Sequence, residues 1–151
     1  MRILSVAIAT IVATAALTAG VADAAAPRIV IFSGKPLTQP IVISDWQAIF
    51  RVFEQLVPAR ARVAPRAELA GRPRLKVSMF WGPRWIDYLR EDKRASALRP
   101  RQADQFGSFY PAWRGRGALI DLSGSGQSPR VVPSKALAVL RQFGVPTKLR
   151  R

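Results

Sequence analysis

Leu75 to Arg94 reads LKVSMFWGPRWIDYLREDKR, and the rest of the chain is organised around this stretch. Alternate residues of its first part are apolar and share one face, as in a strand: Leu75, Val77, Met79 and Trp81. The Gly82-Pro83 pair then predicts a turn, and an aromatic helix is expected over Arg84 to Arg94. The stretch is the densest in aromatic residues and lies mid-chain, so elements on both sides can pack against it. We therefore expect this strand and helix to form the centre of the core.

The chain before this stretch predicts a hairpin and a well-defined amphipathic helix. Arg28 to Ser33 is apolar on both faces, which is typical of a buried central strand, and Pro40 to Ile43 predicts its hairpin partner. Apolar residues at helical spacing then predict a helix from Asp45 to Val57. Ser44 and Gln47 match a capping box at its start, where Asp45 adds a favourable negative charge.

The chain after this stretch predicts a second hairpin and a last helix. Strands are expected over Phe106 to Trp113 and Gly117 to Leu122, joined by Arg114-Gly115-Arg116, because the glycine favours a tight turn. A helix is then expected to begin at Pro133 or Ser134, with an apolar stripe at helical spacing.

The order of elements, β-β-α-β-α-β-β-α, predicts a single α+β domain over residues 25–146. We expect a mixed or antiparallel sheet of about five strands, with about three helices on one face. Gly144 is expected to cap the last helix. Residues 147–151 then form a basic tail, which we expect to be frayed.

The first 24 residues have the pattern of a secretory signal peptide. Arg2 precedes an uncharged run from Ile3 to Leu17, and Ala22-Asp23-Ala24 is a small-residue cleavage site. Cleavage after Ala24 predicts a secreted or periplasmic protein of a bacterial envelope, without a transmembrane helix. The alternative is a retained N-terminal anchor, since about 20 apolar residues can span a bilayer. The many alanines and threonines of the run favour cleavage.

The charge of the chain points to anionic partners. The 151 residues include 24 Lys and Arg against nine Asp and Glu, a net charge of +15. Cleavage would remove one charge of each sign and leave this value unchanged. A field of this size attracts polyanions and anionic surfaces, and arginine suits the recognition of phosphate and carboxylate groups. A GC-rich coding sequence would also favour arginine, although it would not remove the charge.

The absence of histidine and cysteine excludes several classes of activity. Catalytic Ser-His and Cys-His pairs, histidine-containing zinc sites, thiol redox chemistry and disulfides all need residues that this chain lacks. No cofactor and no metal are expected.

The leading hypothesis is a non-enzymatic module that binds an anionic polymer or surface, such as a wall polymer, an acidic glycan or lipid headgroups. The predicted charged contacts lie in the Arg-rich connection before Leu75 and in the turn of the second hairpin: Arg60, Arg62, Arg66, Arg72, Arg74, Arg114 and Arg116. Trp85 and Trp113 are the candidates for stacking, although most aromatic rings are expected to be core. Nucleic acid fits the charge but not a secreted protein. The oligomeric state is left open.

Two alternatives remain open at this point. Asp45 follows one predicted strand, and Asp121 lies near the end of another. These two residues are therefore the candidate pair for a carboxylate-dependent hydrolase. The competing interpretation is that Asp45 caps a helix and Asp121 makes a surface ion pair. The second alternative is a structural or inhibitory module that docks another protein through an apolar patch.

Overall fold

The structure is a computed structural model that describes residues 26–57, 60–91, 94–122 and 128–150. The predicted signal peptide over residues 1–24 lies outside these ranges, as does most of the Gly/Ser-rich segment that follows Leu122. No helix within the described ranges is long and apolar enough to cross a bilayer.

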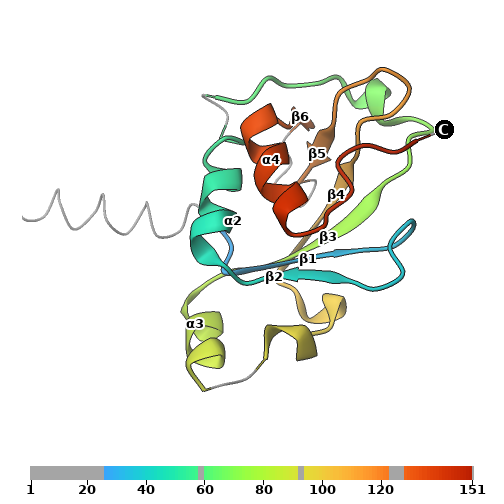
Figure 1. Cartoon of the computed structure of the whole chain (residues 1–151). Helices are drawn as coiled ribbons and strands as arrows, with labels where there is room; N and C mark the ends of the chain where they lie inside the picture. The colour runs from blue at the N-terminus through green and yellow to red at the C-terminus, as the bar shows by residue number, and fades with distance from the viewer. Residues whose placement is uncertain (1–25, 58–59, 92–93, 123–127, 151) are drawn as a thin grey trace, which may run out of the picture.

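The described residues form an antiparallel sheet of six strands in the order β2-β1-β3-β4-β5-β6 (Figure 1). The strands are β1 Ile29–Ser33, β2 Ile41–Ile43, β3 Leu75–Phe80, β4 Gln105–Tyr110, β5 Leu119–Asp121 and β6 Arg130–Val131. The α+β class is therefore confirmed, and the sheet is antiparallel rather than mixed. The strand of the Leu75 to Arg94 stretch, β3, is third in the sheet, between β1 and β4.

The sixth strand was not predicted. It pairs with β5, with Leu119 opposite Val131 and Ile120 opposite Arg130. The Arg130 side chain is buried and donates a hydrogen bond from Nη1 to the carbonyl of Leu56, which follows helix α2 (Trp46–Phe53). Burial lowers the pKa of Arg130. This contact ties the edge of the sheet to the segment that follows α2.

Helices cover both faces of the sheet. They are α2 Trp46–Phe53, α3 Pro83–Arg90 and α4 Ser134–Gln142, with short 3-10 turns η1 Arg66–Leu69, η2 Ala95–Ala97 and η3 Pro100–Gln102. Figure 1 shows α2 and α4 together on one side of the sheet and α3 on the other. The prediction that all helices lie on one face was wrong.

The alternation of β1 explains why both faces are covered. Val30 and Phe32 belong to the larger core cluster, which also contains the apolar side chains of α2 and α4. Ile29 and Ile31 point the other way and pack with Trp85 of α3 in a second cluster. The four apolar side chains of β1 named here are all buried, so this strand needs helices on both faces of the sheet.

The N-terminus of α2 is capped one residue later than predicted. The Asp45 side chain, rather than that of Ser44, accepts a hydrogen bond from the Ala48 backbone N–H at 3.1 Å. The helix also ends at Phe53, four residues before the predicted end at Val57. Backbone bonds from Gln55 to Val52 and from Leu56 to Phe53 tighten the chain into a turn there.

The C-terminus of α4 follows the predicted pattern. Gly144 has φ of 82°, and its N–H donates to the carbonyl of Arg141, while the Val145 N–H donates to that of Leu140. These two bonds define a Schellman motif, which needs a left-handed residue at the position of Gly144.

The expectation of a frayed tail was wrong for its described part. The Ala112 N–H donates to the Thr147 carbonyl at 2.8 Å, and the Leu149 N–H donates to the Ala112 carbonyl at 2.9 Å. Thr147 is buried and Leu149 is half-buried. The domain therefore continues past residue 146, and the tail packs beside the loop between β4 and β5 (Figure 1).

Candidate anion-binding site

The hairpin between β4 and β5 ends in a tight turn, as predicted. Trp113 and Arg116 exchange backbone hydrogen bonds of 3.1 and 3.0 Å across it. The two residues between them, Arg114 and Gly115, have φ of 49° and 77°. Positive φ at both central residues is the pattern of a type I′ turn, which matches the twist of antiparallel strands. The Arg114 guanidinium lies over the Trp113 ring, 4.3 Å from its centroid.

Arg72 lies at the base of this hairpin and joins its two sides. Its Nη2 donates to the carbonyl of Pro111 at 3.1 Å and to that of Gly117 at 2.6 Å. The residue is only 6% exposed. Burial lowers the pKa of Arg72, and the positive charge of Arg116 lowers it further. Arg72 therefore fixes the base of the loop that carries Arg114 and Arg116 at the surface.

Three further basic residues lie at the same end of the sheet. Arg74 directly precedes β3, whose first residue, Leu75, pairs with Phe109 near the end of β4. Lys148 pairs with Ala112, and Arg150 follows the hydrogen-bonded Leu149. We call this group the basic end: Arg72, Arg74, Arg114, Arg116, Lys148 and Arg150. Within the described ranges none of the six makes an ion pair.

Lys148 and Arg150 were missed as site residues because they were assigned to a frayed tail. The sequence contained a signal for them, since Thr147 and Leu149 alternate with the two basic residues. Such alternation predicts a strand with one face buried and the other exposed. Thr147 and Leu149 do face the protein, and Lys148 and Arg150 are exposed.

The other predicted arginines lie elsewhere. Arg60 and Arg62 are exposed on the segment beside β6, where the Arg62 carbonyl accepts the Val131 N–H at 2.8 Å. Arg66, at the start of η1, pairs with Asp121 of β5, with Nη1 and Oδ2 3.2 Å apart. Four of the seven predicted arginines therefore belong to the basic end, and three do not.

The two candidate tryptophans have different environments. Trp85 is buried, packs edge-to-face on Phe80 at 4.8 Å, and donates its indole N–H to Asp104 at 2.8 Å. This placement makes Trp85 part of the core, so it is removed from the candidate site. Trp113 is half-buried and lies beside the basic end, with the Arg114 guanidinium over its ring.

The candidate carboxylate pair is too far apart for joint catalysis. Asp45 follows β2, and Asp121 lies on β5, so β1, β3 and β4 stand between them. Four strand spacings correspond to about 19 Å, whereas paired catalytic carboxyl groups lie within about 10 Å. Asp45 caps α2, and Asp121 is paired with Arg66. The sheet therefore does not bring the predicted pair together, and this separation argues against a hydrolase based on it.

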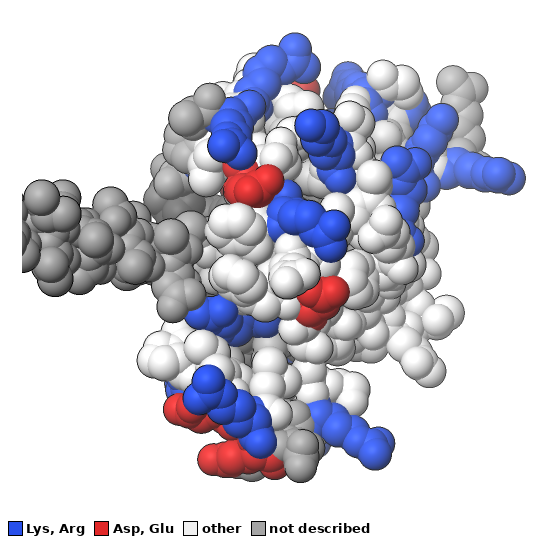
Figure 2. Space-filling model, turned by 60° about the vertical axis from the view of Figure 1, so that its left-hand side comes forward, with Lys and Arg blue, Asp and Glu red and all other residues white. Residues whose placement is uncertain are grey.

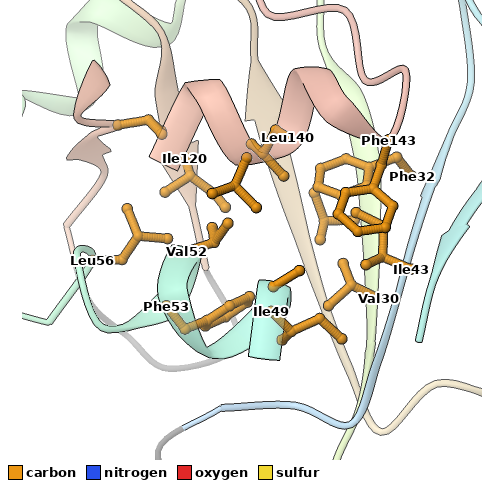
Figure 3. Close-up of a pocket in the computed structure, with 14 residues that line it drawn as sticks. Val30, Phe32, Ile43, Ile49, Val52, Phe53, Leu56, Ile120, Leu140 and Phe143 are labelled. Carbon is orange, nitrogen blue, oxygen red and sulfur yellow. The ribbon is translucent and has the colours of Figure 1, made fainter. Parts of the chain in front are cut away.

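An apolar cavity lies between α2, α4 and the sheet (Figure 3). The cavity has a volume of about 20 Å³. The residues that line it are all apolar, among them Phe32, Ile49 and Leu140. A void of this size has room for about one water molecule but offers no polar partner. We interpret it as a packing gap in the core.

A more open groove of about 440 Å³ lies between the start of α2 and α3. Trp46, Ile86 and Leu89 form its apolar part, and Arg28 and Arg90 supply positive charge. The Arg28 guanidinium lies 5.1 Å from the centroid of the Trp46 ring, and Arg90 lies 4.0 Å from Asp87. The groove was not predicted from the sequence.

Large exposed apolar side chains are scattered in the described part of the chain. They are Val63, beside β6, and Phe106 on β4, which are 56% and 40% exposed. The Lys76 ammonium group lies over the Phe106 ring, 5.1 Å from its centroid. Single exposed residues of this kind are normal and do not form a docking patch.

The distribution of charge differs between the two parts of the molecule. On the face in Figure 2, basic side chains dominate the upper part, whereas basic and acidic side chains lie together on the lower part. In the same lower part, α3 carries the exposed pair Asp87 and Arg90. Among the described residues, no group of three or more acidic side chains could hold a metal ion.

Comparison with known proteins assigns no relative. The chain matches no protein-family model, no curated protein and no solved structure. A function must therefore be inferred from the site itself.

Proposed function

We propose that this protein is a non-enzymatic module that binds an anionic polymer or surface through its basic end. The observation that supports the proposal most strongly is the absence of acidic partners for these six side chains within the described ranges. Arg66, Arg84 and Arg90, by contrast, each lie beside an aspartate. Positive charge at the basic end is therefore available to a ligand, whereas the charge of these three arginines is partly offset.

The geometry of the hairpin suits a ligand that carries repeated negative charge. Arg114 and Arg116 extend from a turn that is fixed below by Arg72, and Lys148 and Arg150 lie on the adjacent C-terminal segment. Each exposed contact is worth roughly 0.5–1 kcal/mol, so several must act together. A polymer can make such contacts at the same time, and the net charge of +15 would attract it from a distance.

Charge-matched variants test the proposal. R114Q/R116Q removes two charges from the basic end, and R99Q/R101Q removes two exposed charges from the segment around η3. The two variants have the same net charge as each other, two units below that of the wild type. We expect R114Q/R116Q to bind polyphosphate roughly tenfold more weakly than the wild type, and R99Q/R101Q to remain within about twofold, because only the first pair contacts the ligand. Titration calorimetry at low salt measures both.

Two outcomes would contradict the proposal. An equal loss in both variants would show that the total charge attracts the polymer without a defined site. Binding that does not change between low and high salt would exclude an electrostatic interaction altogether. Vesicles with anionic lipids, used in place of polyphosphate, distinguish a membrane surface from a soluble polymer.

A further inference from the structure

Arg72 has more hydrogen-bond donors than acceptors. It is 6% exposed, and both of its hydrogen bonds come from Nη2. Its Nε and Nη1 are buried and have no partner within the described residues. A guanidinium group carries five N–H donors, so three of the five lie on nitrogen atoms without an acceptor. Buried donors of this kind are rare in folded proteins, because each one costs free energy.

The surroundings of Arg72 are also short of negative charge. Arg116, the residue before its acceptor Gly117, contributes a second positive charge, and both carbonyl partners are neutral. The acidic residue whose charge affects Arg72 is Glu68, which is exposed and, within the described residues, forms neither a hydrogen bond nor an ion pair with it. A buried charge normally requires an ionic partner or a full set of hydrogen bonds. Arg72 has neither.

We propose that Arg72 and Arg116 form a pocket for one tetrahedral oxyanion group, a phosphate or a sulfate, of the ligand. This rests on the proposed function, since the pocket would hold one charged group of the anionic polymer. The Nε–H and Nη1–H bonds of Arg72 point in different directions, so one bound group would accept from one side of this guanidinium and take its further donors from Arg116. A tetrahedral phosphate or sulfate presents three or more oxygen atoms in different directions to such donors, whereas a carboxylate presents two in one plane. Arginine also binds such groups more readily than lysine does.

Access to the pocket requires only small movements. Arg116 and Glu68, the charged residues that act on Arg72, are both exposed, and so are Arg114 and Gly115 at the turn. We expect an oxyanion to reach Arg72 by displacing exposed side chains near it, such as those of Arg116 and Glu68, while β3 and β4 keep their pairing. The oxyanion then takes the place of Glu68 as the negative charge nearest to Arg72. Glu68→Gln should therefore strengthen binding of the oxyanion, because it removes a competing charge.

Thermal unfolding with small anions tests the pocket without the polymer. A ligand that binds only the folded protein raises Tm, by about 5 °C at tenfold excess over Kd for a domain of this size. Orthophosphate and sulfate should each be compared with chloride at the same ionic strength. We expect one or both to raise Tm of the wild type and of Arg99→Gln, and to raise Tm of Arg116→Gln much less.

The comparison with Arg116→Gln separates specific binding from general salt effects. Phosphate and sulfate stabilise many proteins by exclusion from the surface, and that effect would be the same in every variant. An equal rise in Tm for the wild type and for Arg116→Gln, or no rise in Tm with either anion, would overturn the pocket. Arg72→Lys should also lose the specific rise, but it changes a buried residue, so the exposed Arg116 carries the test.

The two proposals can fail separately. If polyphosphate binds through Arg114 and Arg116 but small anions give no specific rise in Tm, the pocket is wrong and the proposed function stands. If small anions stabilise the wild type specifically but no polymer binds, the pocket stands and the polymer function is wrong. A rise with phosphate alone or with sulfate alone identifies which group the polymer carries.

Discussion

Asp104 shows how a single carboxylate can hold distant segments together. Its Oδ2 accepts hydrogen bonds from the backbone N–H of Trp81 and from the indole N–H of Trp85, both at 2.8 Å. Its Oδ1 pairs with Arg84, and its own N–H donates to the carbonyl of Met79. The residue thus joins the end of β3 and the first turn of α3 to the segment that leads into β4.

Asp104→Ala should therefore be far more costly than the removal of a surface acid. We expect a loss of about 2 kcal/mol in the free energy of unfolding, because the N–H groups of Trp81 and Trp85 lose their acceptor. Asp87→Ala is the matched control, since Asp87 is exposed and lies 4.0 Å from Arg90. Its removal should change stability by less than about 0.5 kcal/mol. Urea unfolding, followed by tryptophan fluorescence, measures both, and equal losses would contradict the assigned role of Asp104.

The sequence predicted side chains well where local pattern determines their burial. Leu75, Val77 and Met79 were assigned to one face of a strand, and all three are buried in the main core cluster. Trp85 was less predictable, because the acceptor of its indole N–H is Asp104, 19 residues further along the chain. No local pattern reveals a partner at that separation. The same holds for Arg72, whose acceptors lie 39 and 45 residues away.

At the level of elements, the cap of α2 gives a direct test of the described geometry. Asp45→Ala should lower the free energy of unfolding by about 1 kcal/mol, because the Ala48 N–H loses its acceptor. Ser44→Ala should change it by only a few tenths, although the sequence pattern had favoured Ser44 as the cap. Thermal or urea unfolding compares the two variants. A larger loss for Ser44→Ala would return the cap to the position expected from the capping-box pattern.

The helices on both faces of the sheet follow from the two apolar faces of β1. Arg28 to Ser33 was recognised as apolar on both faces, yet the helices were placed on one face only. A strand that is buried on both faces needs cover on both, and α3 supplies the second layer. The Trp85 face of α3 matches Ile29 and Ile31, which no helix on the other side could reach.

The sixth strand could not be predicted from periodicity. Arg130–Val131 is too short to show an alternating pattern, and Pro129 and Pro133 lie on either side of it. Its pairing depends on β5 and on the buried Arg130, which donates to Leu56 from 74 residues away. Arginine in a strand also argues against burial on composition alone. Tertiary contacts, rather than local propensity, determine this element.

For the molecule as a whole, the sequence predicted the charge but only part of its location. The turn at Arg114-Gly115-Arg116 was identified correctly, because its glycine favours a tight hairpin. The contribution of the C-terminal segment was missed, since Lys148 and Arg150 join the basic end only through the pairing of Ala112 with Lys148. Arg66 was included in the prediction, but its pairing with Asp121 across 55 residues offsets its charge.

The most direct test of the central claim is a residue-by-residue map of the surface that meets an anionic polymer. Amide chemical shifts of the 15N-labelled protein, recorded during titration with polyphosphate at low salt, provide this map. The proposal predicts that the largest changes fall on residues 112–117 and 147–149 and on the Arg72 side-chain Nε–H. Changes centred instead on α3 and η3, or spread evenly over all exposed arginines, would contradict it.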